Sequence, residues 1–167
     1  MVLIIAEAGV NHNGSIKLAK ELVDAAKSSG ADIIKFQSFL AKNLVIPGAK
    51  KACYQENKNK FNESQYEMLS KLELSFEELS QLKSYCDTKN IELLSSAFDL
   101  DSLRLIKKLN FKRYKIPSGE ITNLPYLRFV AAQNKPIILS TGMSNMQEIS
   151  DAIKVFTFSG VNVRDIT

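Results

Sequence analysis

The chain has 167 residues, of which 45% are hydrophobic, and this is enough for one domain with a buried core. Its formal net charge of +4 is mild and its Lys and Arg residues are scattered, so the composition does not predict a nucleic-acid-binding protein. The composition also excludes low-complexity disorder and a disulfide scaffold, since Cys53 and Cys86 form no CxxC pair and fit a reducing compartment. The apolar start ends at Glu7, too early for a signal peptide or a membrane span, and we therefore expect a soluble, cytoplasmic protein.

In chain order, the hydrophobic pattern first predicts a strand at residues 2–6 and a helix that ends at Gly30. Ser15 is placed to cap this helix. The apolar face of the helix is expected to consist of Leu18, Leu22, Ala25 and Ala26. A second strand follows at residues 33–36, and then a polar connection at 37–62 that is long enough to be a binding loop.

The rest of the chain continues the alternation. Helices are predicted at 64–72 and 75–89, followed by a strand at 91–95, a helix at 99–109 and a short strand at 113–116. A helix at 124–132, a strand at 137–140 and a helix at 146–158 complete the pattern. Strand and helix repeated about five times predict an α/β fold with a parallel sheet.

Two α/β architectures fit this pattern, an open doubly wound sheet and a (β/α)8 TIM barrel. A barrel takes about 250 residues, or roughly 31 per unit. The 167 residues give about 33 for each of five units, so the spacing fits a barrel but only the first five βα units would be present. Five strands would complete an open sheet, and length alone favours that alternative.

Polar residues follow every predicted strand, at the edge where both architectures place their binding sites. The most informative are Lys35 and Lys115, whose ammonium groups are flanked by apolar residues and would lose hydration unless an anion lies nearby. A ligand with carboxylate or phosphate groups is the natural partner. The other polar residues at these strand ends include Glu7, Gln37, Ser95, Ser96, Asp99, Ser118, Glu120, Ser140 and Thr141.

These polar residues also have simpler interpretations. Each turn at Ser118 or Ser140 alone fits a helix cap, and Glu7 fits either a partner for a lysine or a general base. His12, the single histidine, fits a hydrogen bond within its turn better than a metal site. No G-x-G-x-x-G, Walker A or G-x-S-x-G sequence follows a strand, which weakens the nucleotide and hydrolase interpretations.

Five ordered motifs resemble the N-acetylneuraminate (sialic acid) synthase family over essentially the whole chain. They are Ala6-Glu7-Ala8-Gly9-Val10-Asn11-His12-Asn13-Gly14, Lys35-Phe36-Gln37, Gln65-Tyr66-Glu67-Met68-Leu69, Lys115-Ile116-Pro117-Ser118-Gly119-Glu120 and Lys135-Pro136-Ile137-Ile138-Leu139-Ser140-Thr141-Gly142-Met143. The resemblance implies a (β/α)8 barrel followed by an antifreeze-like domain, in a homodimer. It also implies condensation of phosphoenolpyruvate with N-acetylmannosamine or a related N-acetylated hexose, which releases phosphate and gives a nine-carbon α-keto acid.

The resemblance also implies roles for single residues. Glu7 would be the catalytic carboxylate, Lys35, Lys115, Ser118 and Ser140 would bind phosphoenolpyruvate, and Gln37, Glu120 and Thr141 would line the pocket. A divalent metal, Mn²⁺ or Mg²⁺, would polarise the sugar aldehyde, but the family's metal-binding histidines and its later substrate contacts would follow Thr167. The chain is therefore expected to be the N-terminal portion of the barrel, at residues 1–167, and to be inactive alone.

One departure from the family is mild: Ser96-Ala97-Phe98 stands where many members have Thr-Pro-Phe. Three other functions stay open. They are a Schiff-base aldolase that uses Lys35 or Lys115, a related synthase for an aldose phosphate, and a non-catalytic barrel fragment that binds a partner chain. A phosphorylated sugar would demand further cations, and Arg113 and Arg128 are not obviously placed to supply them. Tyr54, Gln55 and Asn62 in the long loop are candidates for the contacts that select the hexose.

Overall fold

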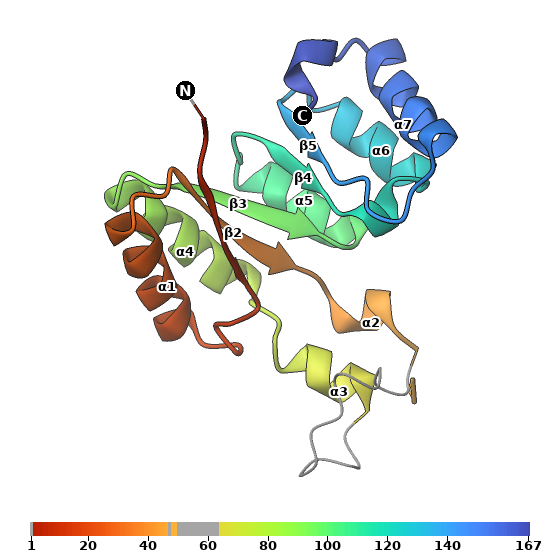
Figure 1. Cartoon of the computed structure of the whole chain (residues 1–167). Coiled ribbons are helices and arrows are strands. Elements are labelled where there is room, and N and C mark those ends of the chain that lie inside the picture. The colour runs from red at the N-terminus through yellow and green to blue at the C-terminus, as the bar shows by residue number, and fades with distance from the viewer. Residues whose placement is uncertain (1, 47, 50–63) are drawn as a thin grey trace.

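The computed structural model describes residues 2–46, 48–49 and 64–167, which form one parallel sheet with helices between its strands (Figure 1). The strands are β1 (Ile5–Gly9), β2 (Ile33–Ser38), β3 (Glu92–Ala97), β4 (Tyr114–Ile116) and β5 (Ile137–Leu139). The helices are α1 (Ile16–Ser28), α2 (Ala41–Leu44), α3 (Gln65–Ser70), α4 (Phe76–Thr88), α5 (Leu100–Lys108), α6 (Leu124–Ala131) and α7 (Met146–Phe158), with 3-10 turns η2 (Ser118–Glu120) and η3 (Val163–Asp165).

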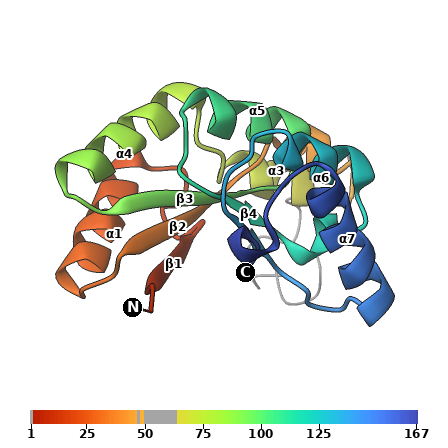
Figure 2. The ribbon, with the colours of Figure 1, turned by 90° about the horizontal axis from the view of Figure 1, so that it is seen from above.

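The strand order decides between the two architectures. The sheet runs β1-β2-β3-β4-β5 in sequence order, and every pair of neighbours is parallel. Right-handed crossovers that always advance in one direction place every helix on the same face, whereas a doubly wound sheet reverses direction and has helices on both faces. Figure 2 shows the helices along the outer side of a curved sheet. The fold is therefore of the (β/α)8 barrel type, and the open sheet that length favoured is wrong.

The same order continues beyond β5. Ile166 forms a parallel bridge with Ile137, and the backbone N–H of Thr167 donates to the carbonyl of Ile137 at 2.9 Å. The N–H of Leu139 in turn donates to the carbonyl of Thr167 at 2.8 Å. The chain thus begins to occupy a sixth strand position beside β5.

Capping side chains are found at the starts of most helices. Ser75 and Glu78 form the expected capping box at the start of α4, in which each side chain accepts from the other residue's backbone N–H. Ser15 caps α1 by accepting from Leu18 N. In α6, Asn123 is the cap and Pro125 occupies the first turn, where its missing N–H costs no helical hydrogen bond.

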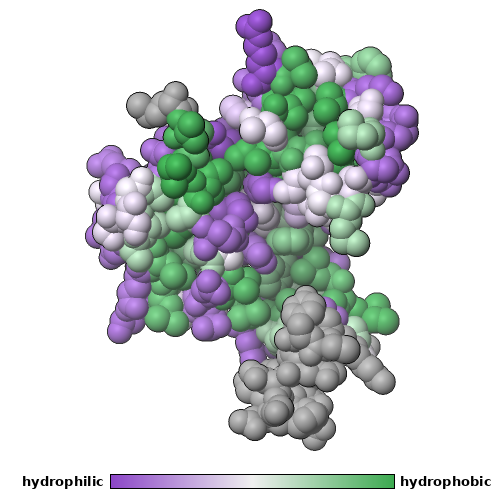
Figure 3. Space-filling model, in the orientation of Figure 1, coloured by the Kyte–Doolittle hydropathy of each residue, from purple (hydrophilic) through white to green (hydrophobic). Residues whose placement is uncertain are grey.

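Two sequence-based expectations need correction. The first strand begins at Ile5 instead of Val2, because pairing with β2 starts at Ile5 opposite Ile33. Val2, Leu3 and Ile4 are 80%, 50% and 55% exposed, and Figure 3 shows hydrophobic surface over this amino-terminal segment. The buried face of α1 contains Ala19, Val23 and Ala26, while Leu18 is exposed, so the helix is rotated by about one residue from the expected face.

The core lies between the sheet and its helices. Side chains from alternate positions of the strands, including Ile34, Phe36 and Ile116, are buried against this helical layer. Tyr126 of α6 is also buried, and its hydroxyl donates to the carbonyl of Ala97 at 2.8 Å, at the end of β3. This packing occupies one face of the sheet and leaves the other side chains of the strands on the concave face. Within the described residues, no helix is both long and apolar enough to cross a membrane.

Gly14→Ala is expected to destabilise the fold by about 3 kcal/mol, through left-handed strain combined with a steric clash. Gly14 has φ +73°, and a Cβ atom there would lie far inside van der Waals distance of the carbonyl oxygen of Lys71. Gly30→Ala is the matched control, because Gly30 has φ +80° with nothing within 4 Å, and it is expected to cost about 1 kcal/mol. Urea unfolding of both variants measures the difference. Equal losses in the free energy of unfolding would contradict a close approach between Gly14 and the carbonyl oxygen of Lys71.

Candidate functional site

The register of the sheet places several chemically active side chains on its concave face. Glu7 in β1 lies opposite Lys35 in β2, and Ser96 in β3 lies opposite Lys115 in β4. Lys35 is itself the partner of Leu94, two residues before Ser96. Since register partners and residues two apart point to the same face, all four polar side chains face away from the helices. Their position near the carboxyl ends of the strands is where barrels of this type bind substrates.

Lys35 is held between two of these residues. Its Nζ forms an ion pair with Oε2 of Glu7 and donates to Oγ of Ser96 at 3.4 Å. The side chain of Lys35 is only 15% exposed, whereas that of Glu7 is 50% exposed. Glu7 therefore presents its carboxylate to the open side of the sheet while its partner lies deeper.

Lys115 lies beside this ion pair. Its Nζ donates to Oγ of Ser140 and to the carbonyl of Ile116, the latter at 3.0 Å. Burial and the charge of Lys35 both lower the pKa of Lys115, and the charge of Glu7 partly opposes them. Lys35, Lys115 and Glu7 thus act on one another electrostatically, and the cluster holds more positive than negative charge. A bound anion would relieve the repulsion between the two ammonium groups.

A cavity of about 250 Å³ lies at the carboxyl ends of β4 and β5. Ser118 and Gly119 from η2 and Gly142 and Ser144 from the turn after β5 contribute to its lining. The hydroxyl oxygen of Ser118 lies 3.5 Å from the position that a Cβ atom on Gly142 would take. Glycine at this turn therefore allows the two loops to approach each other, with hydroxyl groups at their junction.

The remaining residues predicted for the pocket lie at different distances from the lysines. Gln37 is close to Glu7, since a Cβ atom on Gly9 would lie 3.7 Å from Nε2 of Gln37 and 3.3 Å from Oε1 of Glu7. Glu120 accepts a hydrogen bond from Asn123 at 2.6 Å, and Thr141 is exposed. Within the described residues, neither side chain forms a hydrogen bond or ion pair with Lys35 or Lys115. Ser96 was not among the predicted site residues, although Ser95-Ser96 at the end of a strand was a visible signal.

His12 is fully buried and lies outside the lysine cluster. Its Nδ1 accepts from the backbone N–H of Gly14 at 3.0 Å, as expected for a turn residue, and its Nε2 has no hydrogen-bond partner among the described residues. The ring lies 5.9 Å from that of Phe36, centroid to centroid. Burial lowers the pKa of His12, against a smaller opposing effect of Glu78.

The lowered pKa of His12 predicts a loss of stability in mild acid. The unfolded chain takes up a proton near pH 6.5 while folded His12 stays neutral, so the unfolded state binds more protons as pH falls. The contribution of His12 to the free energy of unfolding is therefore complete above pH 6.5 and decreases below it, down to the lowered pKa. His12→Asn supplies another acceptor for Gly14 N and is expected to unfold with a flatter pH dependence in urea between pH 7.5 and 5.5. Parallel pH profiles for variant and wild type would refute this.

No metal centre is found within the part of the chain that the structure describes. It contains no group of three or more His, Cys, Asp or Glu side chains arranged to hold an ion. The described residues do not fit the divalent metal that the family resemblance implies. Cys86 is buried, with its pKa raised to about 12 by loss of hydration, which makes it unsuited as a ligand or nucleophile.

A second cavity, of about 310 Å³, lies at the amino ends of the strands and is lined in part by Asp32, Asn90 and Glu92. Barrels use this opposite edge for stability. Glu92 accepts two hydrogen bonds from Arg113, at 2.6 and 3.1 Å. Arg113 is therefore held at the amino ends of the strands, opposite the edge that contains Lys35 and Lys115. Arg128 is exposed on α6. Tyr54, Gln55, Asn62 and Cys53 lie outside the described residues.

Comparisons with known proteins agree on one family. Residues 22–166 match the model described as the NeuB family. The chain is 52% identical over 165 residues to N,N'-diacetyllegionaminic acid synthase of Campylobacter jejuni, covering 99% of this chain and 49% of that protein. It is 33% identical over 161 residues to N-acetylneuraminate-9-phosphate synthase of Drosophila melanogaster, covering 95% of this chain and 42% of that protein.

The fold has matching relatives among solved structures. N-acetylneuraminic acid (sialic acid) synthetase of Leptospira borgpetersenii, solved in complex with citrate, superposes with a TM-score of 0.78 at 29% sequence identity, covering 95% of this chain and 50% of that chain. A truncated 3-deoxy-D-arabino-heptulosonate 7-phosphate synthase of Thermotoga maritima superposes with a TM-score of 0.65 at 16% identity, which supports the fold alone. The chain spans about half the length of the curated relatives it matches.

Proposed function

The chain belongs to the NeuB family, and from this premise we propose that it forms the N-terminal portion of a synthase barrel that condenses phosphoenolpyruvate with an N-acetylated hexose. The products would be phosphate and a nine-carbon α-keto acid of the sialic acid type. The observation that carries the proposal is the cluster of Glu7, Lys35 and Lys115 on the concave face, where the repulsion between two part-buried ammonium groups favours a ligand with two anionic groups.

Four residues are proposed to hold phosphoenolpyruvate. Lys35 and Lys115 would neutralise its carboxylate and phosphate, and the hydroxyls of Ser118 and Ser140 would donate to their oxygens. Ser140 already accepts from Lys115, and Ser118 lines the neighbouring cavity, so the donors lie along the ends of adjacent strands β4 and β5. Fixed donors in a pocket that excludes water cost little reorganisation during the reaction.

The proposed reaction needs a general base, and we propose Glu7 for this role. The enol carbon C3 of phosphoenolpyruvate attacks the aldehyde carbon of the open-chain hexose, and positive charge develops at C2. The aldehyde oxygen takes up a proton and becomes a hydroxyl of the product. Water adds at C2 and gives up one proton to a general base. The new C2 hydroxyl loses its second proton as the bond from C2 to the phosphate oxygen breaks, so that the C2 carbonyl forms and phosphate leaves. We propose that Glu7 takes the proton from that water as a general base, which its half-exposed carboxylate beside Lys35 supports.

An assay of the chain alone and of the chain completed by the second half of the Campylobacter jejuni barrel tests this proposal. N-acetylmannosamine and a diacetamido-hexose serve as acceptors, with phosphate release and product mass as readouts. We expect the isolated chain to be inactive and the completed barrel to release phosphate with one acceptor. A completed barrel that binds phosphoenolpyruvate but releases no phosphate with any acceptor would overturn the proposed reaction.

The lowered pKa of Lys115 also favours a second candidate, a Schiff-base aldolase, because such enzymes use a lysine that is neutral near physiological pH. Incubation with pyruvate and borohydride separates the two functions. The synthase proposal expects no covalent adduct. A stable adduct on Lys115 or Lys35, absent from the corresponding methionine variant, would establish the aldolase instead.

A further inference from the structure

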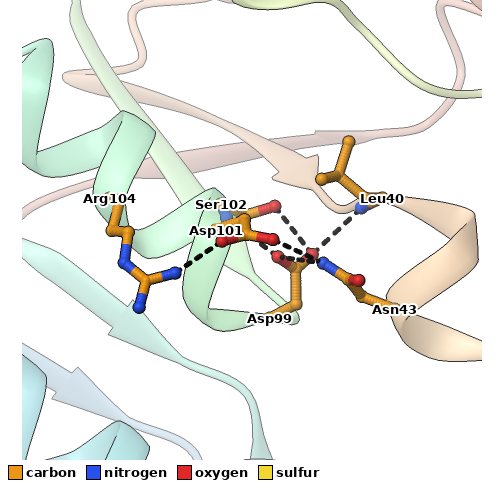
Figure 4. A network of polar contacts seen from close by, with 6 residues as sticks. All are labelled: Leu40, Asn43, Asp99, Asp101, Ser102 and Arg104. Carbon is orange, nitrogen blue, oxygen red and sulfur yellow. Dashed lines mark hydrogen bonds and ion pairs between the residues drawn. The ribbon is translucent and has the colours of Figure 1, made fainter.

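A polar network joins the segment after β2 to the start of α5 (Figure 4). Asp99, the cap of α5, accepts from the backbone N–H and the hydroxyl of Ser102 at 2.9 and 2.8 Å. The same carboxylate accepts from Leu40 N at 2.9 Å and from Nδ2 of Asn43 at 3.2 Å. These hydrogen bonds divide between its own helix and a segment 56 or more residues earlier in the sequence.

Capping alone does not require this arrangement. One oxygen acceptor satisfies the first turn of a helix, and serine or asparagine serves as well as aspartate. The second oxygen of Asp99 instead accepts from Leu40, the residue that precedes α2. Glu73, in the link between α3 and α4, accepts from the next backbone N–H, that of Ala41, at 2.6 Å. Carboxylates from two different loops thus hold two consecutive N–H groups where the chain leaves β2.

The segment held in this way leads directly to the candidate site. Leu40 follows Gln37 by three residues, and Gln37 lies close to Glu7. Between them, the carbonyl of Ser38 accepts from Phe98 N at 3.0 Å, and the hydroxyls of Ser38 and Ser95 are 2.7 Å apart. The chain after β2 is therefore fastened to the chain after β3 from Ser38 to Asn43.

This fastened segment lies on one side of the site. Ser118 and Ser140, proposed to hold phosphoenolpyruvate, follow β4 and β5, whereas Glu7 and Gln37 belong to β1 and β2. In Figure 1, α2 and α3 lie beyond the end of β2, away from α6 and α7. Of the residues proposed to hold phosphoenolpyruvate, Lys35 belongs to this side, and Gln37 lies two residues beyond it in β2. The hexose would then approach along Gln37, from the side opposite Ser118 and Ser140.

We propose that Asp99 is a positioning residue which, through Leu40 and Asn43, fixes the Gln37 side of the pocket and so governs how the acceptor hexose is held. The inference rests on the proposed function. Asp99 acts through the backbone of the β2–α2 segment and touches neither substrate.

Two variants break the link without removing the cap of α5. Asp99→Ser retains a hydroxyl that accepts from Ser102 N but is too short to reach Leu40, and Asn43→Ala removes the partner while leaving Asp99 intact. Arg104→Ala is the control, because Arg104 pairs with Asp101 at the exposed edge of the same network and its loss leaves the hydrogen bond from Nδ2 of Asn43 to Asp101, at 3.0 Å, in place. Each is made in the active enzyme that contains this chain, and KM for both substrates, kcat and amide exchange at Leu40 are measured.

We expect Asp99→Ser to lower kcat/KM for the hexose by about 10-fold, as for loss of a charge-assisted hydrogen bond, with KM for phosphoenolpyruvate changed less than about twofold. Asn43→Ala should act in the same direction but less strongly, and Leu40 should exchange faster in Asp99→Ser alone. The proposal would be overturned if kcat/KM fell equally for both substrates, or if amide exchange at Leu40 were unchanged in Asp99→Ser. If the wild-type enzyme makes no product, the proposed function fails, and the exchange at Leu40 still decides whether Asp99 holds this segment.

Discussion

Replacing Lys115 with methionine is expected to weaken the binding of phosphoenolpyruvate by about 100-fold, or about 2.7 kcal/mol. Methionine keeps an unbranched apolar side chain of similar length but removes the ammonium group that donates to Ser140 and the carbonyl of Ile116. The ligand would then face Lys35 alone, and one of its anionic groups would be left without a counter-charge in a site that is partly shielded from water. Titration calorimetry with phosphoenolpyruvate measures the effect directly.

The control for this variant is Lys112→Met, which removes the same charge three residues earlier in the sequence. Lys112 is exposed and lines the cavity at the amino ends of the strands, on the opposite edge of the sheet. Its replacement is expected to leave the affinity unchanged. If Lys115→Met binds phosphoenolpyruvate as tightly as the wild type, the ammonium cluster is not the anion site.

Glu7→Gln is expected to lower kcat by about 100- to 1,000-fold with little loss of phosphoenolpyruvate affinity. Glutamine keeps the size of the side chain and one acceptor oxygen for Lys35, but it cannot take a proton from the attacking water. It also removes a negative charge beside Lys35, which favours an anionic ligand. Steady-state kinetics combined with calorimetry separate these two effects.

Glu21→Gln serves as the control for Glu7, since Glu21 lies exposed on α1, where it pairs with Lys17 at 4.0 Å. It is expected to show wild-type kinetics. Unchanged kcat in Glu7→Gln would exclude Glu7 as the general base, and a parallel loss of affinity would assign it a binding role instead.

The sequence was sufficient to predict that Glu7, Lys35 and Lys115 lie at one edge of the sheet, because the topology of a parallel sheet places them there. In a parallel sheet, the carboxyl ends of all strands share one edge, so Lys35 and Lys115 had to lie on the same side once their strands were identified. The register could not be predicted, since a shift of one residue exchanges the two faces of a strand. Ser96 was recognised as a strand-end residue but given no role at the site, and its contact with Lys35 depends on this register.

Other features depend on contacts that sequence patterns do not contain. Leu18 was assigned to the buried face of α1, but a helix with alanine and leucine on adjacent stripes fits more than one rotation, and packing selected Ala19 and Val23. The link between Asn43 and Asp99 spans 56 positions, so no local motif indicates it. The strand order β1 to β5 confirms the (β/α)8 barrel type that the family resemblance implied, whereas the length of the chain alone had favoured an open sheet.

The central claim is that Glu7, Lys35 and Lys115 form a single site for a small phosphorylated enol acid. A crystal structure of the chain grown with phosphoenolpyruvate tests it most directly. We predict that the ligand lies on the concave face of the sheet, with its anionic groups within hydrogen-bonding distance of Nζ of both lysines and with Glu7 beside C2. A ligand bound at the amino ends of the strands, or one contacted by neither lysine, would contradict the account.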